Sequence, residues 1–303
     1  MKKSISLILL VILLILTAGC GQVDSDGGSV SSNNSLGLNN SSETSKPTSS
    51  VENVSSKEDT LVDDWRTHPE DYKLIALTYD DAPSFSDATG NSTVKIIDTL
   101  NRYEGRGTLF VIGNKLTTNG DALLKFAVDK GFELGNHTYS HKSVSTSEVG
   151  KNWTATENLD DFKRCQDIVE TWTGVKMKYL RPAGVHANEA LYEAAKGLGL
   201  PCISGNCKSA VSDYKSDVSA EMIVERVLDN AFDGAIILLH GNNTRTAEAT
   251  ERICDILYNE GYRFCTVDEL FRFKGLDYDN LPSGVMLYGV DPVTGEPIVE
   301  KEY

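Results

Sequence analysis

The chain is short of positive charge. Its 29 lysines and arginines stand against 44 aspartates and glutamates, and the formal net charge is −15 at pH 7. Binding to a polyanion depends on basic side chains that contact its phosphates, so nucleic acid is excluded as the expected partner. None of the six cysteines has a CxxC spacing, which argues against a cysteine-rich metal site. Histidine is scarce as well, with five residues in 303.

The apolar run near the N-terminus is too short for a bilayer. It extends from Ile5 to Leu16, whereas a spanning helix needs roughly 20 apolar residues. Two lysines precede the run and Thr17-Ala18-Gly19-Cys20 follow it, so residues 1–20 are predicted to be an export signal. Its ending resembles a bacterial lipoprotein signal. The resemblance implies a surface protein anchored by a lipid on Cys20, and the alternative is an ordinary secretory signal with release from the cell.

The next segment is poor in large apolar side chains. Residues 21–60 are rich in Ser, Asn and Gly, so burial cannot offset the entropy of ordering, and a flexible tether is expected. Residues 61–273 suit one large α/β domain, expected to be a monomer. Residues 274–303 form a C-terminal extension to which the sequence assigns no role. A domain of this size does not depend on disulfides, and whether Cys202 and Cys207 pair stays open.

Short apolar runs alternate with amphipathic stretches from Lys73 onward. The predicted strands are residues 74–77, 108–112, 132–135, 178–181, 201–204, 235–239 and 262–265. The predicted helices lie around residues 94–100, 123–127, 157–172, 188–198, 219–231 and 246–260. This alternation indicates a parallel sheet covered by helices. A distorted (β/α) barrel fits the length best, and a doubly wound open sheet is the alternative.

Polar motifs follow the predicted strands at their C-terminal ends. They are Thr78-Tyr79-Asp80-Asp81-Ala82-Pro83, His137-Thr138-Tyr139-Ser140-His141, Arg181-Pro182-Ala183-Gly184, Asp213-Tyr214 and Leu238-Leu239-His240. In β/α barrels the catalytic groups project from these strand ends, so we expect the motifs to converge on one rim.

Three residues in these motifs have the chemistry of metal ligands. A carboxylate from Asp81 and imidazoles from His137 and His141 suit zinc, and three protein ligands leave one position open for water. The two histidines are four residues apart, a spacing that puts both on one face of a helical turn. Solvated side chains and a simple Asp-Pro turn are the plainer alternatives.

The motifs and their order resemble the polysaccharide deacetylase family, the NodB-like carbohydrate esterases of family 4. The resemblance implies a barrel of the NodB type. It implies that Asp80 is the catalytic base and that one divalent metal, zinc or alternatively cobalt or nickel, is held by Asp81, His137 and His141. Tyr79 and Ala82 stand where the family usually has Phe and Gly.

The resemblance also assigns the remaining motifs. Arg181 would lie against Asp80, and the backbone N–H of Gly184 would help to hold the oxyanion. His240 would be the general acid, oriented by Asp213. Tyr214 and Leu238 would form a pocket for the acetyl methyl group. The departures are Ala183 for Pro, Gly184 for Tyr and Tyr214 for Trp.

The resemblance implies a hydrolase that removes N-acetyl groups from a polysaccharide. Peptidoglycan N-acetylglucosamine is the first expected substrate, because a tethered surface enzyme has it close at hand, and chitin-like oligomers are the second. An O-acetyl esterase acting on xylan would use the same residues. A non-catalytic carbohydrate-binding relative would be expected to lack Asp80 or His240, and both are present.

Overall fold

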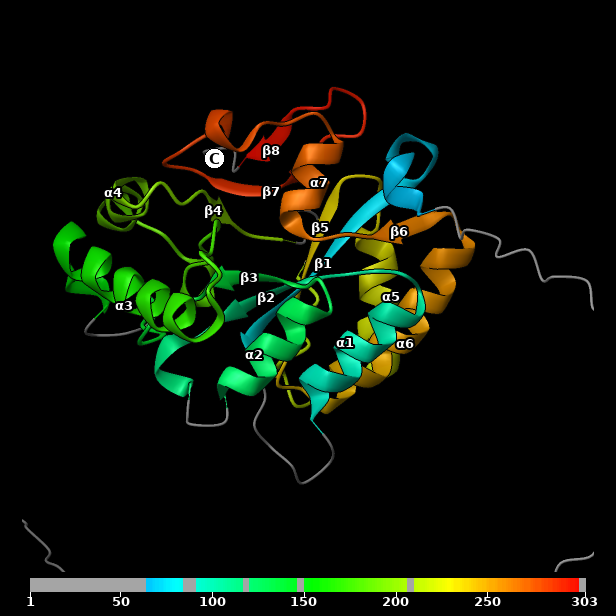
Figure 1. The fold of residues 1–303 in the computed structure, drawn as a ribbon, viewed down its shortest axis with the longest axis horizontal. Helices are drawn as coiled ribbons and strands as arrows, with labels where there is room; N and C mark the ends of the chain where they lie inside the picture. The colour runs from blue at the N-terminus through cyan, green and yellow to red at the C-terminus, as the bar shows by residue number, and fades with distance from the viewer. Residues whose placement is uncertain (1–63, 84–90, 117–119, 146–149, 206–209, 300–303) are drawn as a thin grey trace, which may run out of the picture. The chain divides into compact units, whose positions relative to one another are not determined.

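The centre of the structure is one long buried strand, β1 (Lys73–Ala82), in an eight-stranded sheet (Figure 1). The computed structural model describes residues 64–83, 91–116, 120–145, 150–205 and 210–299. The predicted signal and tether, residues 1–20 and 21–60, lie outside this part of the chain. None of the helices within it is both long and apolar enough to cross a membrane.

The sheet is mixed and curled. Its order is β3-β2-β1-β5-β7-β4, with β6 on the first half of β1 and β8 on β7. The other strands are β2 (Thr108–Val111), β3 (Glu133–Asn136), β4 (Cys202–Ile203), β5 (Ala235–His240), β6 (Tyr262–Phe264), β7 (Met286–Val290) and β8 (Pro297–Val299).

The prediction of a strand at 178–181 is wrong. The structure has only isolated bridges there, from Leu180 to Asn136 of β3 and from Leu180 to Cys202 of β4. These two bridges nevertheless join the ends of the strand order, so the sheet closes through a single residue. The prediction of a distorted barrel is thereby confirmed, and the doubly wound open sheet is not what forms.

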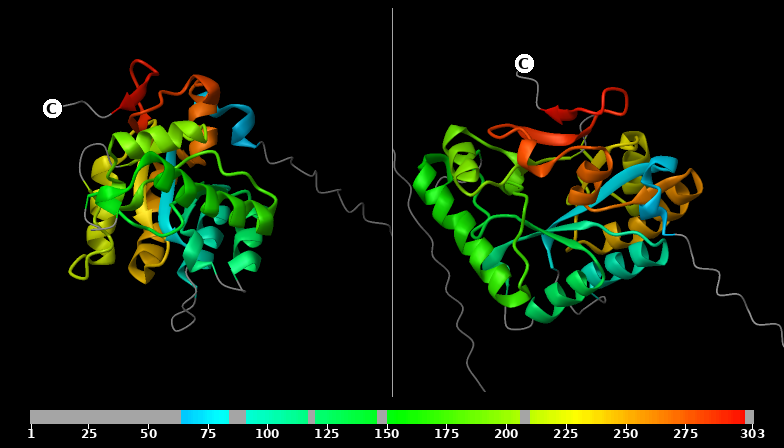
Figure 2. Two further views of the ribbon diagram at one scale, coloured as in Figure 1. Left: turned by 90° about the vertical axis from the view of Figure 1, so that its left-hand side faces the viewer. Right: turned by 45° about the horizontal axis from the view of Figure 1, so that its top comes forward.

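Helices cover the outer face of the sheet (Figures 1 and 2). They are α1 (Ser92–Arg102), α2 (Gly120–Asp129), α3 (Ala155–Thr173), α4 (Glu189–Gly197), α5 (Ala220–Asn230) and α6 (Thr244–Asn259). A further helix, α7 (Val267–Phe273), packs on the inner side, where its buried residues share a cluster with Leu74 and Ala76 of β1. All but α7 match helices expected from the apolar spacing. Polar side chains begin several of them; Thr154 and Glu157, for example, form a reciprocal capping box at the start of α3.

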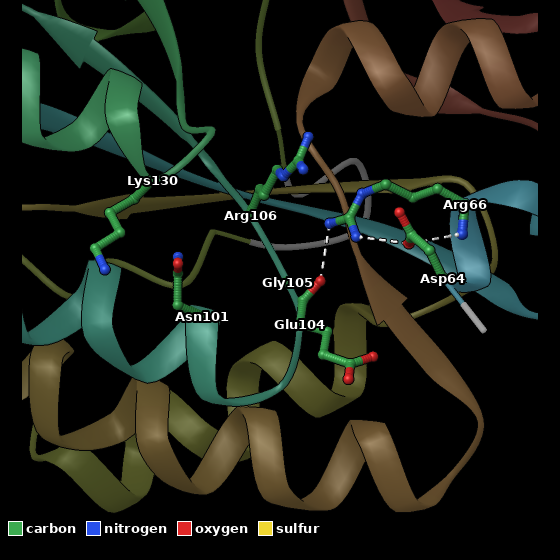
Figure 3. A pocket seen from close by; sticks show the side chains of 7 residues that line it. All are labelled: Asp64, Arg66, Asn101, Glu104, Gly105, Arg106 and Lys130. Carbon is green, nitrogen blue, oxygen red and sulfur yellow. Dashed lines mark hydrogen bonds and ion pairs between the residues drawn. The ribbon is translucent and has the colours of Figure 1, made fainter. Parts of the chain in front are cut away.

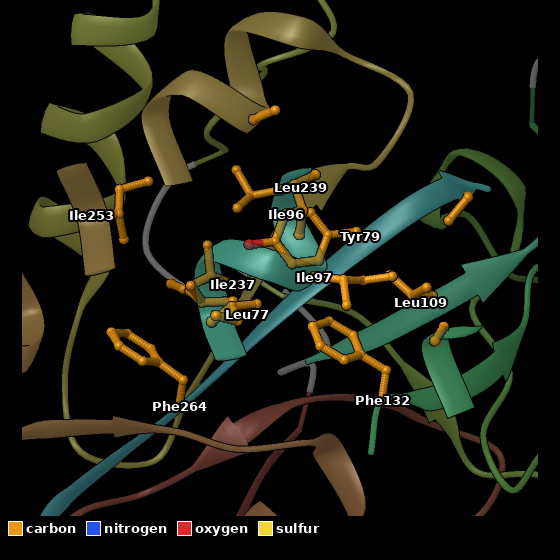
Figure 4. Packing of buried hydrophobic residues seen from close by; sticks show 14 of the residues in the cluster. Leu77, Tyr79, Ile96, Ile97, Leu109, Phe132, Ile237, Leu239, Ile253 and Phe264 are labelled. Atoms are coloured by element: carbon orange, nitrogen blue, oxygen red, sulfur yellow. The ribbon is translucent and has the colours of Figure 1, made fainter. Parts of the chain in front are cut away.

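Strand alternation divides the core into an outer and an inner part. Ile75, Leu77 and Tyr79 of β1 pack outward in the cluster that contains helix residues such as Ile96 and Ile253 (Figure 4). Leu74 and Ala76 belong to a second cluster inside the sheet, together with Ile236 of β5. Both faces of β1 are therefore apolar, as expected for a strand buried on both sides. The inward row continues through Thr78 to Asp80, where it becomes polar at the rim.

The C-terminal extension, to which the sequence assigned no role, contributes β7 and β8 to the sheet. β7 is parallel to β4 and antiparallel to β5, where Ala235 pairs with Gly289. Gly234 and Gly289 both have positive φ, and a Cβ on either would collide with backbone of the other strand. Two glycines at this crossing therefore allow β7 to approach β5.

Candidate functional site

A cavity of about 570 Å³ lies at the C-terminal ends of the central strands. The predicted site residues that line it are Asp80, His137, His141, Gly184, Asp213, Tyr214, Leu238 and His240. Arg181 and Asp81 contact members of this set: Arg181 pairs with Asp80, and Asp81 lies against His137. The expectation that the five motifs meet at one rim is thus met by the geometry.

Strand register brings the first and last motifs together. β1 and β5 are parallel neighbours in an unbroken ladder from Ile75–Ala235 to Asp80–His240. Residues 80 and 240 are the inward-facing ends of these two strands, which Figure 1 shows side by side at the centre of the sheet. Pairing of two buried apolar strands therefore places a carboxylate directly opposite an imidazole.

A local irregularity lets both adjacent carboxylates face the rim. Consecutive side chains in a regular strand point to opposite faces. The ladder between β1 and β2 shifts between Tyr79 and Ala82, and Asp81 has a φ of 59°. As a result, Oδ2 of Asp80 and Oδ1 of Asp81 each lie 3.7 Å from Nε2 of His137. The positive φ falls on Asp81 and not on Ala82, so alanine at position 82 is not strained.

The two metal-candidate histidines lie on a loop after β3, so the expected helical turn is wrong. Thr138 and His141 have φ values of 66° and 53°. Asn136 Oδ1 accepts the N–H of Thr138, and the hydroxyl of Thr138 accepts the N–H of His141. These side-chain bonds replace helical bonds and bring the rings to a centroid separation of 4.8 Å.

The donor set fits a divalent metal. One ligand atom each from Asp81, His137 and His141 lies within 4.8 Å of the others. Oδ1 of Asp81 is buried without a hydrogen-bond partner among the described residues and lies 3.5 Å from Nε2 of His141. Nδ1 of His137 lies 2.8 Å from the carbonyl oxygen of Arg181. A carbonyl only accepts, so Nδ1 carries the proton and Nε2 presents its lone pair to the metal position.

The charge states suit metal binding too. Burial opposes ionisation of Asp81, but the nearby His137 and Lys115 outweigh it and lower the pKa of that carboxyl. Burial, and then the proximity of His137, lower the pKa of His141, which favours its neutral form. Metal ligands must be a deprotonated carboxylate and neutral imidazoles.

Asp80 is held by a fully buried arginine. The Nη1 of Arg181 donates to Oδ1 of Asp80 and to the hydroxyl of Thr78, both at 2.8 Å. Its Nε and Nη2 donate to the carbonyls of Ile203 and Ser204, and the guanidinium lies 4.0 Å from the ring centre of Phe110. Removing one partner of such a buried pair commonly costs about 3–5 kcal/mol.

His240 has its own carboxylate partner. Its Nδ1 lies 2.8 Å from Oδ1 of Asp213, whose Oδ2 accepts the backbone N–H of His240 and the hydroxyl of Thr246. Asp213 is wholly buried. Burial lowers the pKa of His240, but the hydrogen bond that its ring donates to Asp213 and the charge of Asp80 outweigh this effect, so the pKa is raised.

The remaining predicted residues line two walls. Gly184 has a φ of 65° in a short turn, Ala183–Val185, and a Cβ there would approach Nδ1 of His186 and the hydroxyl of Ser143. On the other wall the ring of Tyr214 is 63% exposed and stands edge-on to His240 at 5.4 Å. Leu238 lies beside it on β5.

Some lining residues had no signal in the sequence. Tyr288 comes from β7, and Ser204 and Gly205 from the chain after β4. No motif marks them, because their position depends on how β7 packs. Thr246 was missed as well, although it lies in the first turn of α6, six residues after His240.

A second pocket, of about 290 Å³, lies at the opposite strand ends, before β1 and β2 (Figure 3). Its cations are engaged: Arg66 bonds the carboxylate of Asp64 and the carbonyl of Glu104, and Arg106 pairs with Glu269. The metal-candidate residues lie at the other pocket, which is therefore the better candidate site.

Replacing Asp213 should lower the pKa of His240. In Asp213→Asn the ring keeps a neutral acceptor but loses the charge that favours the imidazolium. NMR titration of the metal-free protein should show the His240 midpoint at lower pH than in the wild type. Because the pKa of His240 is higher in the folded than in the unfolded protein, its protonation stabilises the fold. This stabilisation is fully present below the unfolded pKa and is lost as pH rises through the folded pKa. The destabilisation by Asp213→Asn should therefore be larger at acid than at alkaline pH.

The exposed Asp217→Asn is the matched control, because it removes one charge from the same loop. An unchanged His240 midpoint in Asp213→Asn would contradict the electrostatic role of Asp213.

Comparison with known proteins supports this site. Residues 67–203 match the polysaccharide deacetylase family. The chain is 35% identical over 209 residues to a peptidoglycan-N-acetylglucosamine deacetylase of Bacillus cereus, covering 68% of this chain and 92% of the relative. It is 34% identical over 218 residues to a bifunctional xylanase/deacetylase of Pseudobutyrivibrio xylanivorans, covering 70% of this chain but 32% of that longer protein.

A solved structure agrees. A family 4 acetyl xylan esterase from Clostridium thermocellum, in complex with a cobalt ion, matches with a TM-score of 0.60 and 27% identity. The match covers 68% of this chain and 94% of that one. The extent of the relationship to the Bacillus cereus enzyme, together with the family match, shows that this chain belongs to the polysaccharide deacetylase family.

Proposed function

We propose that the protein is a metal-dependent hydrolase that removes N-acetyl groups from N-acetylglucosamine units of a cell-wall polysaccharide. The observation that carries the proposal is a carboxylate held by an arginine and an imidazole held by a carboxylate, both beside one metal-candidate triad. Asp80, which pairs with Arg181, lies near the end of β1, and His240, which pairs with Asp213, is its register partner in β5.

The metal would be held by Asp81, His137 and His141, with zinc as our first choice and cobalt or nickel as alternatives. When bound, it would polarise the substrate carbonyl and lower the pKa of water in the site. Nitrogen and carboxylate ligands of this kind suit all three ions.

Asp80 is the general base in this proposal. Its Oδ1 is occupied by Arg181, while Oδ2 points toward His137 and the metal position. The Oδ2 atom is therefore the one that accepts the proton of the attacking water. The arginine fixes the carboxylate so that no reorientation is needed during the reaction.

His240 is the general acid. Its Nδ1 proton is bonded to Asp213, so the proton that it transfers is on Nε2. The raised pKa extends to higher pH the range in which the ring carries the proton that an acid must donate. Nε2 gives its proton to the amide nitrogen as the bond from that nitrogen to the acetyl carbon breaks. The products are acetate and a free amine on the sugar.

The two walls of the cavity position the acetyl group. The backbone N–H of Gly184 would donate to the oxyanion that forms on the carbonyl oxygen. Tyr214 and Leu238 would enclose the methyl group on the opposite side, beside His240.

The choice of peptidoglycan rests on the Bacillus cereus relative and on the predicted export of the chain. Chitin oligomers share the acetylated unit and are the second candidate. An O-acetyl xylan esterase is the alternative, because both the bifunctional xylanase/deacetylase and the acetyl xylan esterase are similar to this chain. A protein that only binds carbohydrate would not need Arg181 to orient Asp80 or Asp213 to orient His240.

Acetate release from a substrate panel tests the proposed function. The purified protein should release acetate from peptidoglycan and chitin oligomers, and a chelator should abolish the release until zinc is restored. A His137→Ala, His141→Ala double variant should lose about one bound metal per chain by elemental analysis, because two of three ligands are gone. His68→Ala, an exposed histidine, is the control. Full activity without metal would refute metal dependence, and release from acetylated xylan alone would favour the alternative.

Separate acid and base roles predict different dependence on the leaving group. Asp80→Asn and His240→Ala should each lower turnover on an N-acetyl glycan by about 10²–10⁴-fold while the metal content stays unchanged. An aryl acetate expels a stable anion that needs no proton. His240→Ala should therefore be far less impaired on the aryl acetate, whereas Asp80→Asn should be impaired on both. Equal defects of His240→Ala on the two substrates would remove it from the acid role.

We also propose that the protein is exported and held at the cell surface through a lipid on Cys20. The proposal is supported by the sequence before Cys20 and by the cell-wall substrates named for the relatives. Replacing Cys20 by Ala should move the protein from the membrane fraction to the medium. Wild-type protein found free and without lipid in the medium would show that the anchor is absent.

A further inference from the structure

One histidine of the cavity is left without a role by the proposed reaction. Four histidines line the cavity: His137, His141, His186 and His240. Three of their rings have partners. His137 bonds the carbonyl of Arg181, His141 lies against Asp81, and His240 bonds Asp213. The His186 ring has no hydrogen bond, ion pair or ring contact with any described residue; it is exposed and is one of the side chains that line the cavity.

The backbone on both sides of His186 is held in place. Before it, Gly184 and Val185 have φ values of 65° and 59°, and the Val185 N–H bonds the Pro182 carbonyl. Left-handed backbone is unusual for a β-branched residue and costs about 1–2 kcal/mol. After it, Asn188 caps α4 by accepting the Leu191 N–H. A strained turn and a helix cap therefore bracket the two residues between them, and backbone strain of this kind is concentrated at functional sites.

The ring lies beside the position proposed for the oxyanion. Nδ1 of His186 is 3.4 Å from where a Cβ on Gly184 would stand. The ring does not belong to the group of ligand atoms that converges on the metal position, which among the described residues comprises Asp81, His137 and His141. His186 is thus close to the reacting carbonyl but outside the metal-ligand set.

We propose that His186 positions the substrate by hydrogen-bonding a hydroxyl of the sugar unit that carries the acetyl group. The inference rests on the proposed function. A sugar is far larger than its acetyl group, so with the carbonyl at Gly184 the sugar extends over the neighbouring wall, where the His186 side chain has no partner among the described residues. An imidazole offers one donor and one acceptor nitrogen, and a hydroxyl matches both.

Binding measured without turnover tests the inference separately from the reaction. In an Asp80→Asn background, the dissociation constant for penta-N-acetylchitopentaose is measured by calorimetry. Adding His186→Ala should raise it about 3- to 10-fold, the range for loss of one neutral hydrogen bond. His186→Gln, whose amide also donates and accepts, should recover part of the loss. His68→Ala is the control and should leave the constant unchanged.

Kinetics give a second measurement. In the otherwise wild-type protein, His186→Ala should lower kcat/KM on the chitin oligomer more than on an aryl acetate, which has no sugar hydroxyl, and should leave the shape of the pH–rate profile unchanged. Glutamine should again rescue in part. An equal loss on both substrates, or a shifted pH profile, would mean that His186 acts on the acetyl group or on a proton, and would overturn the inference.

The outcomes separate the two proposals. Normal oligomer binding in His186→Ala overturns the inference, whatever the activity of the wild type. A defect confined to peptidoglycan would mean that the ring serves a peptide or lactyl carboxylate and not a hydroxyl. Oligomer binding that depends on His186 without any acetate release would contradict the proposed function and leave the inference standing.

Discussion

The buried pair of Arg181 and Asp80 is the interaction on which the site depends. The guanidinium of Arg181 reaches across the inside of the sheet and joins the end of β1 to the carbonyls of Ile203, the last residue of β4, and of Ser204. The backbone carbonyl oxygen of Arg181 also accepts a hydrogen bond from Nδ1 of His137. One residue therefore orients the proposed base, fixes the tautomer of a proposed metal ligand and ties together the two sides of the sheet where regular pairing is reduced to the bridges at Leu180. A lysine could not do this, because a single ammonium lacks the planar, divergent donors.

The site stores backbone strain that the core supports. Of the six non-glycine residues with positive φ in the described part of the chain, Glu104 alone lies away from the cavity. The other five are Asp81, Thr138, His141, Val185 and Ser212. Left-handed backbone lets short loops turn side chains back over the strand ends. The extended apolar clusters beneath keep this conformation populated, since each strained residue costs only about 1–3 kcal/mol.

The sequence was a good guide wherever apolar periodicity determines structure. It predicted β1, β2, β3, β4, β5, β6 and six helices, and with them the rim on which the motifs meet. It failed at residues 178–181, where the structure has no strand and only Leu180 forms β-bridges, to Asn136 and to Cys202. It also failed at residues 137–141, where Asn136 and Thr138 side chains supply the bonds that a helical turn would otherwise provide. Local side-chain bonds of this type compete with helix and carry no periodicity.

The sequence did not predict the part of the cavity that is formed by β7, a segment far in sequence from the motifs. β7 is short, and its place between β5 and β4 is set by the close approach of Gly234 and Gly289, a contact between residues far apart in sequence. That placement brings Tyr288 to the cavity from a segment that has no recognisable motif. The proposed chemistry therefore depends on residues from the predicted strand ends, while the wall that meets the rest of the substrate comes partly from elsewhere. Relatives that share the metal-candidate triad can thus differ in the polysaccharide that they accept, because the two parts of the cavity are built by independent stretches of chain.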